Sequence, residues 1–179
     1  MQWSKMKKQL EERLCDSLKD HIRYQSTRYR GTHDQEGRAW VTYGKEIIYD
    51  FCTIRRSYKF NSLAYELRKK TNSLNWRDNK QADGYWEAYR QAEEQMEFEG
   101  EYSQYEFYNA VDQYINSPID EAMLSDDPII RALSMFDKRL GKRRLGINAI
   151  ENNEKPIVKL FKTIRMQAEG LVDEVGNIT

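Results

Sequence analysis

The spacing of apolar side chains along the chain is first helical, then strand-like, then helical again. Residues 4–19 carry an apolar side chain at every fourth position: Met6, Leu10, Leu14 and Leu18. An apolar repeat of this kind forms one stripe on a helix, and Ser4 has a side chain suited to cap the helix start. The sequence therefore predicts an amphipathic N-terminal helix.

Between residues 21 and 53, β-branched and aromatic residues occur in short runs of the kind that form strands. Three such runs are separated by turn-forming residues: 21–30, 38–43 and 46–51. Gly44-Lys45 joins the last two runs, and its leading glycine suits a two-residue type II′ hairpin turn. We therefore expect a three-stranded antiparallel β-meander after the first helix.

From about residue 60 onward the pattern is helical, with recognisable start and stop signals. Leu63 and Leu67 indicate a helix before a polar loop at residues 71–83. The later signals are Asp83 and Gly100 at the two ends of one helix, a capping box at Ser103 and Glu106, Asp127-Pro128 at the start of another helix, and Pro156 and Gly170 at the ends of the last one. Residues 171–179 are expected to fray.

These elements predict one α+β domain over residues 1–179, with a helix and β-meander over about 1–53 and a mostly helical portion over about 60–170. Hydrophobic residues make up 39% and charged residues 32% of the 179 positions, which is enough apolar material for a self-standing core. No Pro/Gly/Ser-rich linker and no internal repeat divides the chain.

The sequence also favours a cytoplasmic location without metal or cofactor. The basic N-terminus lacks the apolar core of a signal peptide, and no stretch approaches the roughly 18 apolar residues of a membrane span. Cys15, Cys52, His21 and His33 do not occur in the paired spacings of a zinc site, and intracellular thiols are normally reduced. No phosphate-binding glycine loop occurs either, so we expect no cofactor.

Charge is sorted along the chain although the formal total is zero. Residues 1–83 hold 18 Lys and Arg against 11 Asp and Glu, residues 84–127 hold one against twelve, residues 128–166 hold ten against three, and the last thirteen carry −3. Opposite blocks can pair inside the fold or present separate surfaces to partners. The sequence leaves both arrangements open, with mutual pairing favoured.

Two stretches resemble a family of small, uncharacterised bacterial proteins. The first is the opening Met1-x-Trp3-Ser4-Lys5, and the second is the run from Asp127 to Leu145, DPIIRALSMFDKRLGKRRL. The resemblance implies a bacterial, cytoplasmic protein. It implies no activity, partner or site residue.

Most aromatic residues of the second half lie in the acidic block. Tyrosine and tryptophan among carboxylates suit a surface that binds a basic protein, because aromatic rings anchor interfaces and complementary charge speeds association. Such surfaces look like those of immunity proteins that neutralise basic nuclease toxins. The candidate interface comprises Tyr85, Tyr89, Glu93, Glu97, Tyr105 and Tyr108. The alternative is that most of these rings belong to the core.

A basic segment at residues 138–144 is the second candidate site. Its cations are Lys138, Arg139, Lys142, Arg143 and Arg144, which could contact nucleic-acid phosphates. The alternative is that they interact with the C-terminal end of a helix or pair with the acidic block. Nucleic-acid binding is therefore our second functional hypothesis, behind binding of a basic protein.

No catalytic signature supports an enzyme. His33-Asp34 has no serine or cysteine nucleophile placed beside it by a motif, and a histidine and aspartate in a loop more often shape a turn. Glu93 and Glu97 lie one helical turn apart but lack the Glu-x-x-His partner of a di-metal site. We expect a non-enzymatic interaction protein and assign no catalytic residue.

Overall fold

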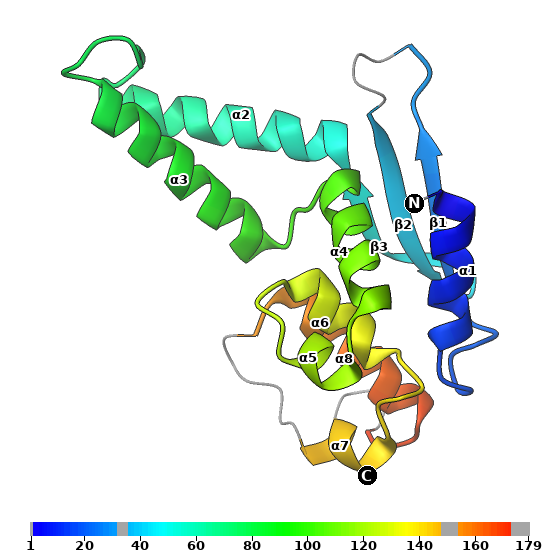
Figure 1. Cartoon of the computed structure of the whole chain (residues 1–179). Helices are drawn as coiled ribbons and strands as arrows, with labels where there is room; N and C mark the ends of the chain where they lie inside the picture. The colour runs from blue at the N-terminus through cyan, green and yellow to red at the C-terminus, as the bar shows by residue number, and fades with distance from the viewer. Residues whose placement is uncertain (1, 32–35, 148–153, 173–179) are drawn as a thin grey trace.

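The computed structural model describes residues 2–31, 36–147 and 154–172. In chain order its elements are α1 (Trp3–Arg13), β1 (Ile22–Arg28), β2 (Gly37–Tyr43), β3 (Glu46–Cys52), α2 (Thr53–Lys70), α3 (Ala82–Glu99), α4 (Gln104–Asn116), α5 (Ile119–Met123), α6 (Pro128–Met135), α7 (Lys142–Ile147) and α8 (Pro156–Ala168) (Figure 1). The predicted α+β class is confirmed: a helix, a three-stranded sheet and then helices.

The sheet is an antiparallel meander in the order β1-β2-β3. Tyr24 of β1 lies opposite Val41 of β2, and Val41 lies opposite Tyr49 of β3, with an irregularity between Val41 and Thr42. Gly44 connects β2 to β3 with a φ of +58°, a value that favours glycine. The hairpin predicted at Gly44-Lys45 is therefore confirmed.

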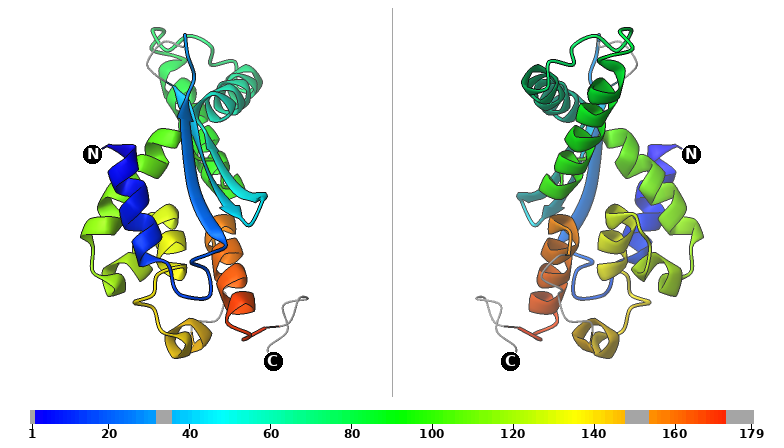
Figure 2. Two further views of the ribbon diagram at one scale, coloured as in Figure 1. Left: turned by 90° about the vertical axis from the view of Figure 1, so that its right-hand side faces the viewer. Right: turned by 90° about the vertical axis from the view of Figure 1, so that its left-hand side faces the viewer.

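One face of the sheet is covered by α1 and α4, which lie on the same side of it (Figure 2). Phe51 of β3 stacks on Phe107 of α4 with ring centroids 4.4 Å apart. The same core continues towards the C-terminus, where Phe136 stacks on Phe161 of α8, also at 4.4 Å. Among the described residues, no member of α2 or α3 belongs to this core.

The first helix is shorter than its apolar repeat predicts. It ends at Arg13 instead of residue 19, and Gln2, not Ser4, occupies the N-cap position. Cys15 N–H donates to the carbonyl of Phe136 at 2.9 Å, and Lys138 N–H donates to the carbonyl of Arg13 at 2.8 Å. These hydrogen bonds join segments that are far apart in the sequence. They satisfy backbone groups that would otherwise bond within a longer helix.

The later helix signals are confirmed where the capping side chain makes its hydrogen bond. Ser103 and Glu106 form a capping box, and Asp127 Oδ1 accepts from Ile129 N–H at 2.7 Å. Two other helix starts differ from the prediction. Helix α2 begins directly after β3, at Thr53 instead of near residue 60, and Gln81 instead of Asp83 occupies the N-cap position of α3.

Candidate protein-interaction surface

Helices α2 and α3 form a long antiparallel hairpin that extends away from the rest of the molecule (Figure 1). Each helix has 18 residues. The side chains buried along their seam are small or flexible: Ala64, Ala88, Ala92 and Met96. Alanines let two helices approach closely but bury little apolar area, so this pair has only a thin core of its own.

The outer surface of this hairpin is rich in exposed apolar side chains. Across the described parts of the chain, twelve large hydrophobic side chains are exposed, and eight of them lie within the hairpin: Ile54, Tyr58, Tyr65, Leu74, Trp76, Trp86, Tyr89 and Phe98. We call these eight residues the hairpin surface. Contiguous exposed apolar patches are typical of contact sites for proteins, membranes or ligands, whereas isolated exposed apolar residues are ordinary. The hairpin surface is therefore the candidate interaction surface.

Four rings of the hairpin form a continuous cluster across the two helices. Phe60 lies edge-on to Tyr89 at 4.9 Å, Tyr89 contacts Trp86 at 5.9 Å, and Trp86 lies edge-on to Tyr85 at 5.4 Å between centroids. The guanidinium of Arg68 lies 3.7 Å from the centre of the Tyr85 ring. Trp86 and Tyr89 remain 49% and 38% exposed, so the cluster offers a preformed aromatic surface with two rings facing solvent.

The two helices of the hairpin carry opposite charge. Helix α2 has six Lys and Arg against one Glu, a formal +5, and α3 has six Asp and Glu against one Arg, a formal −5. Some charges pair at the base of the hairpin: Arg56 contacts Glu93 at 2.7 Å and Glu106 at 2.9 Å, and Arg55 contacts Glu101 at 3.2 Å. The acidic block thus pairs in part with basic residues and in part faces solvent.

The candidate interface residues predicted from sequence divide between two elements. Tyr85, Tyr89, Glu93 and Glu97 share α3, where Glu93 is bonded to α2 and Glu97 lies 3.5 Å from Lys155. The other two, Tyr105 and Tyr108, lie on α4.

The two tyrosines of α4 differ in their packing. Tyr105 is 45% exposed. Tyr108 is half-buried, stacks on Trp3 at 5.3 Å and shares a 2.6 Å hydrogen bond with Ser26. The structure brings the α3 residues together on the hairpin and places Tyr108 against the sheet-covering helices.

Sequence reasoning missed the contribution of α2 to the hairpin surface. Ile54, Tyr58 and Tyr65 occupy positions i, i+4 and i+11, which lie on one side of a helix with 3.6 residues per turn. Phe60 contacts Tyr89 of α3, and Leu63 and Leu67 are half-buried. The available signal was this second apolar stripe, since one stripe suffices for a helix that packs on a single neighbour.

The basic segment at residues 138–144 is organised by a buried carboxylate. Asp137 is fully buried, and its Oδ2 accepts hydrogen bonds from Tyr114 Oη at 2.5 Å and from Arg139 Nη2 at 2.6 Å. Burial opposes ionisation of Asp137, yet these hydrogen bonds hold the pKa of its carboxyl below the ordinary value. Arg139 therefore stabilises the loop after α6.

Other cations of this segment also face oxygen atoms. Lys138 Nζ donates to the carbonyl of Glu12 at 2.7 Å, Lys142 lies 2.6 Å from Glu169, and Arg144 forms an ion pair with Asp120. The sequence suggested that this segment ends a helix that begins at Pro128, but α6 already ends at Met135. The segment crosses a loop and enters the six-residue α7.

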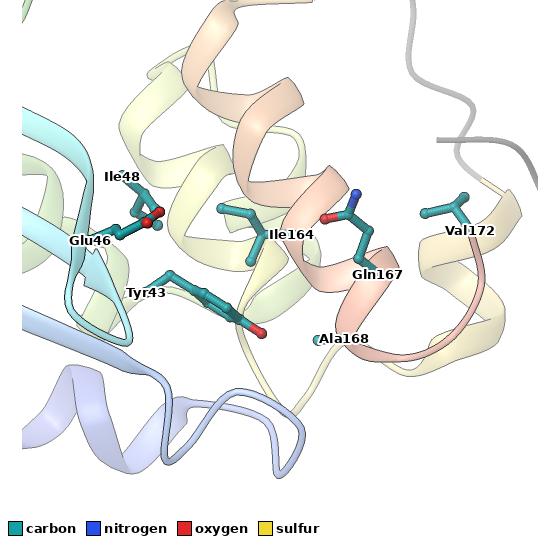
Figure 3. A pocket seen from close by; sticks show the side chains of 7 residues that line it. All are labelled: Tyr43, Glu46, Ile48, Ile164, Gln167, Ala168 and Val172. Carbon is teal, nitrogen blue, oxygen red and sulfur yellow. The ribbon is translucent and has the colours of Figure 1, made fainter. Parts of the chain in front are cut away.

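An open cavity of about 660 Å³ lies between the β2–β3 hairpin and α8 (Figure 3). Its walls are mostly apolar, with two polar side chains: Tyr43, Ile48, Ile164, Ala168 and Val172 with Glu46 and Gln167. Tyr43 and Glu46 are its titratable side chains, and this pair does not form a recognisable acid–base or nucleophilic arrangement.

The described residues offer no metal centre, because none of their His, Cys, Asp and Glu side chains group in threes that could hold an ion. Cys15 and Cys52 are both free thiols. His33-Asp34 and most of the tail at 171–179 lie outside the described residues. Within the part of the chain that is described, every helix is too short or too polar to cross a membrane.

Comparison with known proteins identifies the family of this chain. No curated protein and no solved structure matches the chain. The model of the SF0329 protein family matches residues 2–166, which include the sheet, the hairpin and all but the end of α8. The match includes residues 2–5 of the opening stretch and the whole run from Asp127 to Leu145, and the chain belongs to the SF0329 protein family.

Proposed function

We propose that this chain is a non-enzymatic protein-interaction domain of the bacterial cytoplasm, and that the α2–α3 hairpin carries its binding surface. The observation that supports this most is the hairpin surface: six exposed apolar side chains on α2 and α3 and two on their connection. Among the described residues, neither helix contributes a member to the main core. Because these side chains lie outside the main core, packing of that core does not explain why they are exposed on the hairpin.

The hairpin surface has the composition of a binding hot spot. Tryptophan and tyrosine are enriched among residues that dominate binding energy. An aromatic ring buries about 150–250 Å² on full burial, so covering the exposed half of Trp86 is worth about 2–3 kcal/mol at about 25 cal/mol/Å². Two or three such rings would anchor a partner of moderate affinity after the cost of association is subtracted.

The charge of α3 favours a basic partner. Glu87, Glu94 and Glu99 are exposed around Trp86 and Phe98, and the helix has a single basic residue, Arg90. Opposite charge on the partner would speed encounter and make the association sensitive to salt. A basic nuclease toxin, the target class of immunity proteins, would fit this chemistry.

The basic segment at 138–144 supports nucleic-acid binding less well. Arg139 is committed to buried Asp137, and Lys138, Lys142 and Arg144 each face a carbonyl or carboxylate oxygen. A phosphate-binding surface needs cations that are free to neutralise phosphates and release counterions.

Site-specific photo-cross-linking in host cells tests the proposed function. A photoreactive amino acid replaces Trp86, and a matched control replaces Leu124, which is 84% exposed just after α5. We expect a discrete protein adduct from position 86 and none from position 124. Equal labelling at both positions, or recovery of nucleic acid alone, would contradict the proposal.

A further inference from the structure

We infer that the partner of the hairpin surface is a second copy of this chain, so that two hairpins associate into a four-helix bundle. This inference rests on the proposed function and names the partner of the same surface. In the bundle, α2 of each protomer packs against α3 of the other. The arrangement follows from the self-complementary charge of the hairpin and from its uncovered apolar residues.

The charges of the two helices are equal and opposite, at +5 for α2 and −5 for α3. A two-fold axis parallel to the hairpin would place the basic helix of each copy against the acidic helix of the other. A two-fold axis perpendicular to the hairpin would instead place like-charged helices together. Most soluble homodimers use a two-fold axis with one self-complementary surface, and charge selects the parallel axis here.

The charges nearest the tip of the hairpin remain available for such pairing. Arg55, Arg56 and Lys59 bond to Asp50, Glu93, Glu101 and Glu106 at the base. At the other end, Lys69 and Lys70 are exposed at the C-terminal end of α2, and Asp83 and Glu87 are exposed near the N-terminal end of α3. Glu87 forms an ion pair with Arg90 of its own helix. Among the described residues, none of these four side chains forms an ion pair with the opposite helix of its own hairpin.

The register within the hairpin also fixes which parts of two copies would meet. Phe60 contacts Tyr89, and Arg68 contacts Tyr85, so the C-terminal end of α2 lies level with the N-terminal half of α3. An axis parallel to the hairpin preserves these levels. Lys69 and Lys70 of one copy would then lie within reach of the acidic first turns of α3 in the other, about one Debye length or less away at physiological salt.

Apolar burial would supply most of the binding energy of this bundle. Two packed helices leave their outer sides in water, and a second pair of helices provides the missing layer. On α2, Ile54, Tyr58 and Tyr65 form the exposed stripe, and on α3 the largest exposed ring is Trp86. The connection adds Trp76, which is 50% exposed at the tip.

Charge-swap variants of the full chain test the inference by light scattering after size exclusion. One variant carries Asp83→Lys with Glu87→Lys on α3, and the other carries Lys69→Glu with Lys70→Glu on α2. We expect the wild type to be a dimer and each variant alone to have a dimer dissociation constant raised at least about tenfold. An equimolar mixture of the two variants should recover the dimer, since opposite charges then meet in both helix pairs.

Leu124→Ala is the control for loss of an exposed apolar side chain outside the hairpin and should leave the wild-type dimer unchanged. Circular dichroism and thermal unfolding of each variant separate loss of association from loss of fold. A wild type that stays monomeric at every concentration, or a dimer that survives in both separate variants, would overturn the inference. A cross-link from position 86 to a different, basic protein would overturn it while supporting the proposed function.

Discussion

Arg139 either stabilises the loop after α6 through Asp137 or is free to bind phosphate. The variant Arg139→Ala tests which of the two roles it has. Its guanidinium donates to both carboxylate oxygens of Asp137, with distances of 2.6–3.1 Å. Removing it leaves a fully buried carboxylate with hydrogen bonds from Tyr114 Oη and from the backbone N–H of residue 139. We expect a clear loss of stability.

The size of this loss follows from the burial of each partner. Breaking a fully buried ion pair costs about 3–5 kcal/mol, because the remaining charge is left without its partner. The Arg139 side chain is 34% exposed, so water screens the pair and the two remaining donors reduce the penalty. We therefore expect about 2–3 kcal/mol, or a fall in Tm of about 4–12 °C for a chain of this size.

The loss should also depend on pH in a defined direction. The pKa of Asp137 is lowered in the folded protein, so its contribution is present above the pKa of the unfolded chain and is lost as the pH falls through the folded value. The difference between wild type and Arg139→Ala should be full near neutral pH and shrink below about pH 4.

Urea denaturation at several pH values measures both effects. Arg143→Ala is the matched control, since Arg143 is exposed in the same segment and should change the free energy of unfolding by less than about 0.5 kcal/mol. A cost for Arg139→Ala as small as that of the control would refute the structural role and return Arg139 to the candidate phosphate contacts.

Three further variants probe the other conclusions. Trp86→Ala should change the free energy of unfolding by less than about 1 kcal/mol, because the ring is half exposed, while strongly reducing capture of the partner found by cross-linking; retained capture would argue against the hairpin surface. Gly100→Ala should cost about 1–2 kcal/mol or more in urea denaturation, because Gly100 has a φ of +74°, whereas Gly141→Ala, with open space around its Cβ position, should cost less. Arg143→Ala with Arg144→Ala should leave fluorescence anisotropy of labelled single-stranded DNA unchanged at physiological salt; a large loss of binding would favour the nucleic-acid hypothesis.

Much of the fold is encoded in local signals of the sequence. The glycine at position 44, the capping box at Ser103 and the Asp127-Pro128 start each act within a few residues, and all three occur as predicted. Such signals work because turn and cap hydrogen bonds are made between near neighbours in the chain. The strands and most helices could therefore be located without any knowledge of tertiary contacts.

The end of the first helix could not be located in this way. Leu14 and Leu18 continue the apolar repeat and are both buried, yet the helix stops at Arg13. The backbone there pairs with residues 136–138, which lie more than a hundred positions away in the chain. A local pattern carries no information about such a partner.

The sequence by itself determined the α+β class, the meander, several helix ends and the separation of acidic from basic residues. It did not determine which tyrosines of the acidic block are buried: Tyr102 and Tyr114 are buried, whereas Tyr89 and Tyr105 are exposed. That outcome depends on which helices cover the sheet and which extend from it. Because burial of a ring is set by all the elements packed around it, only the tertiary structure decided that α2 and α3 form the exposed hairpin.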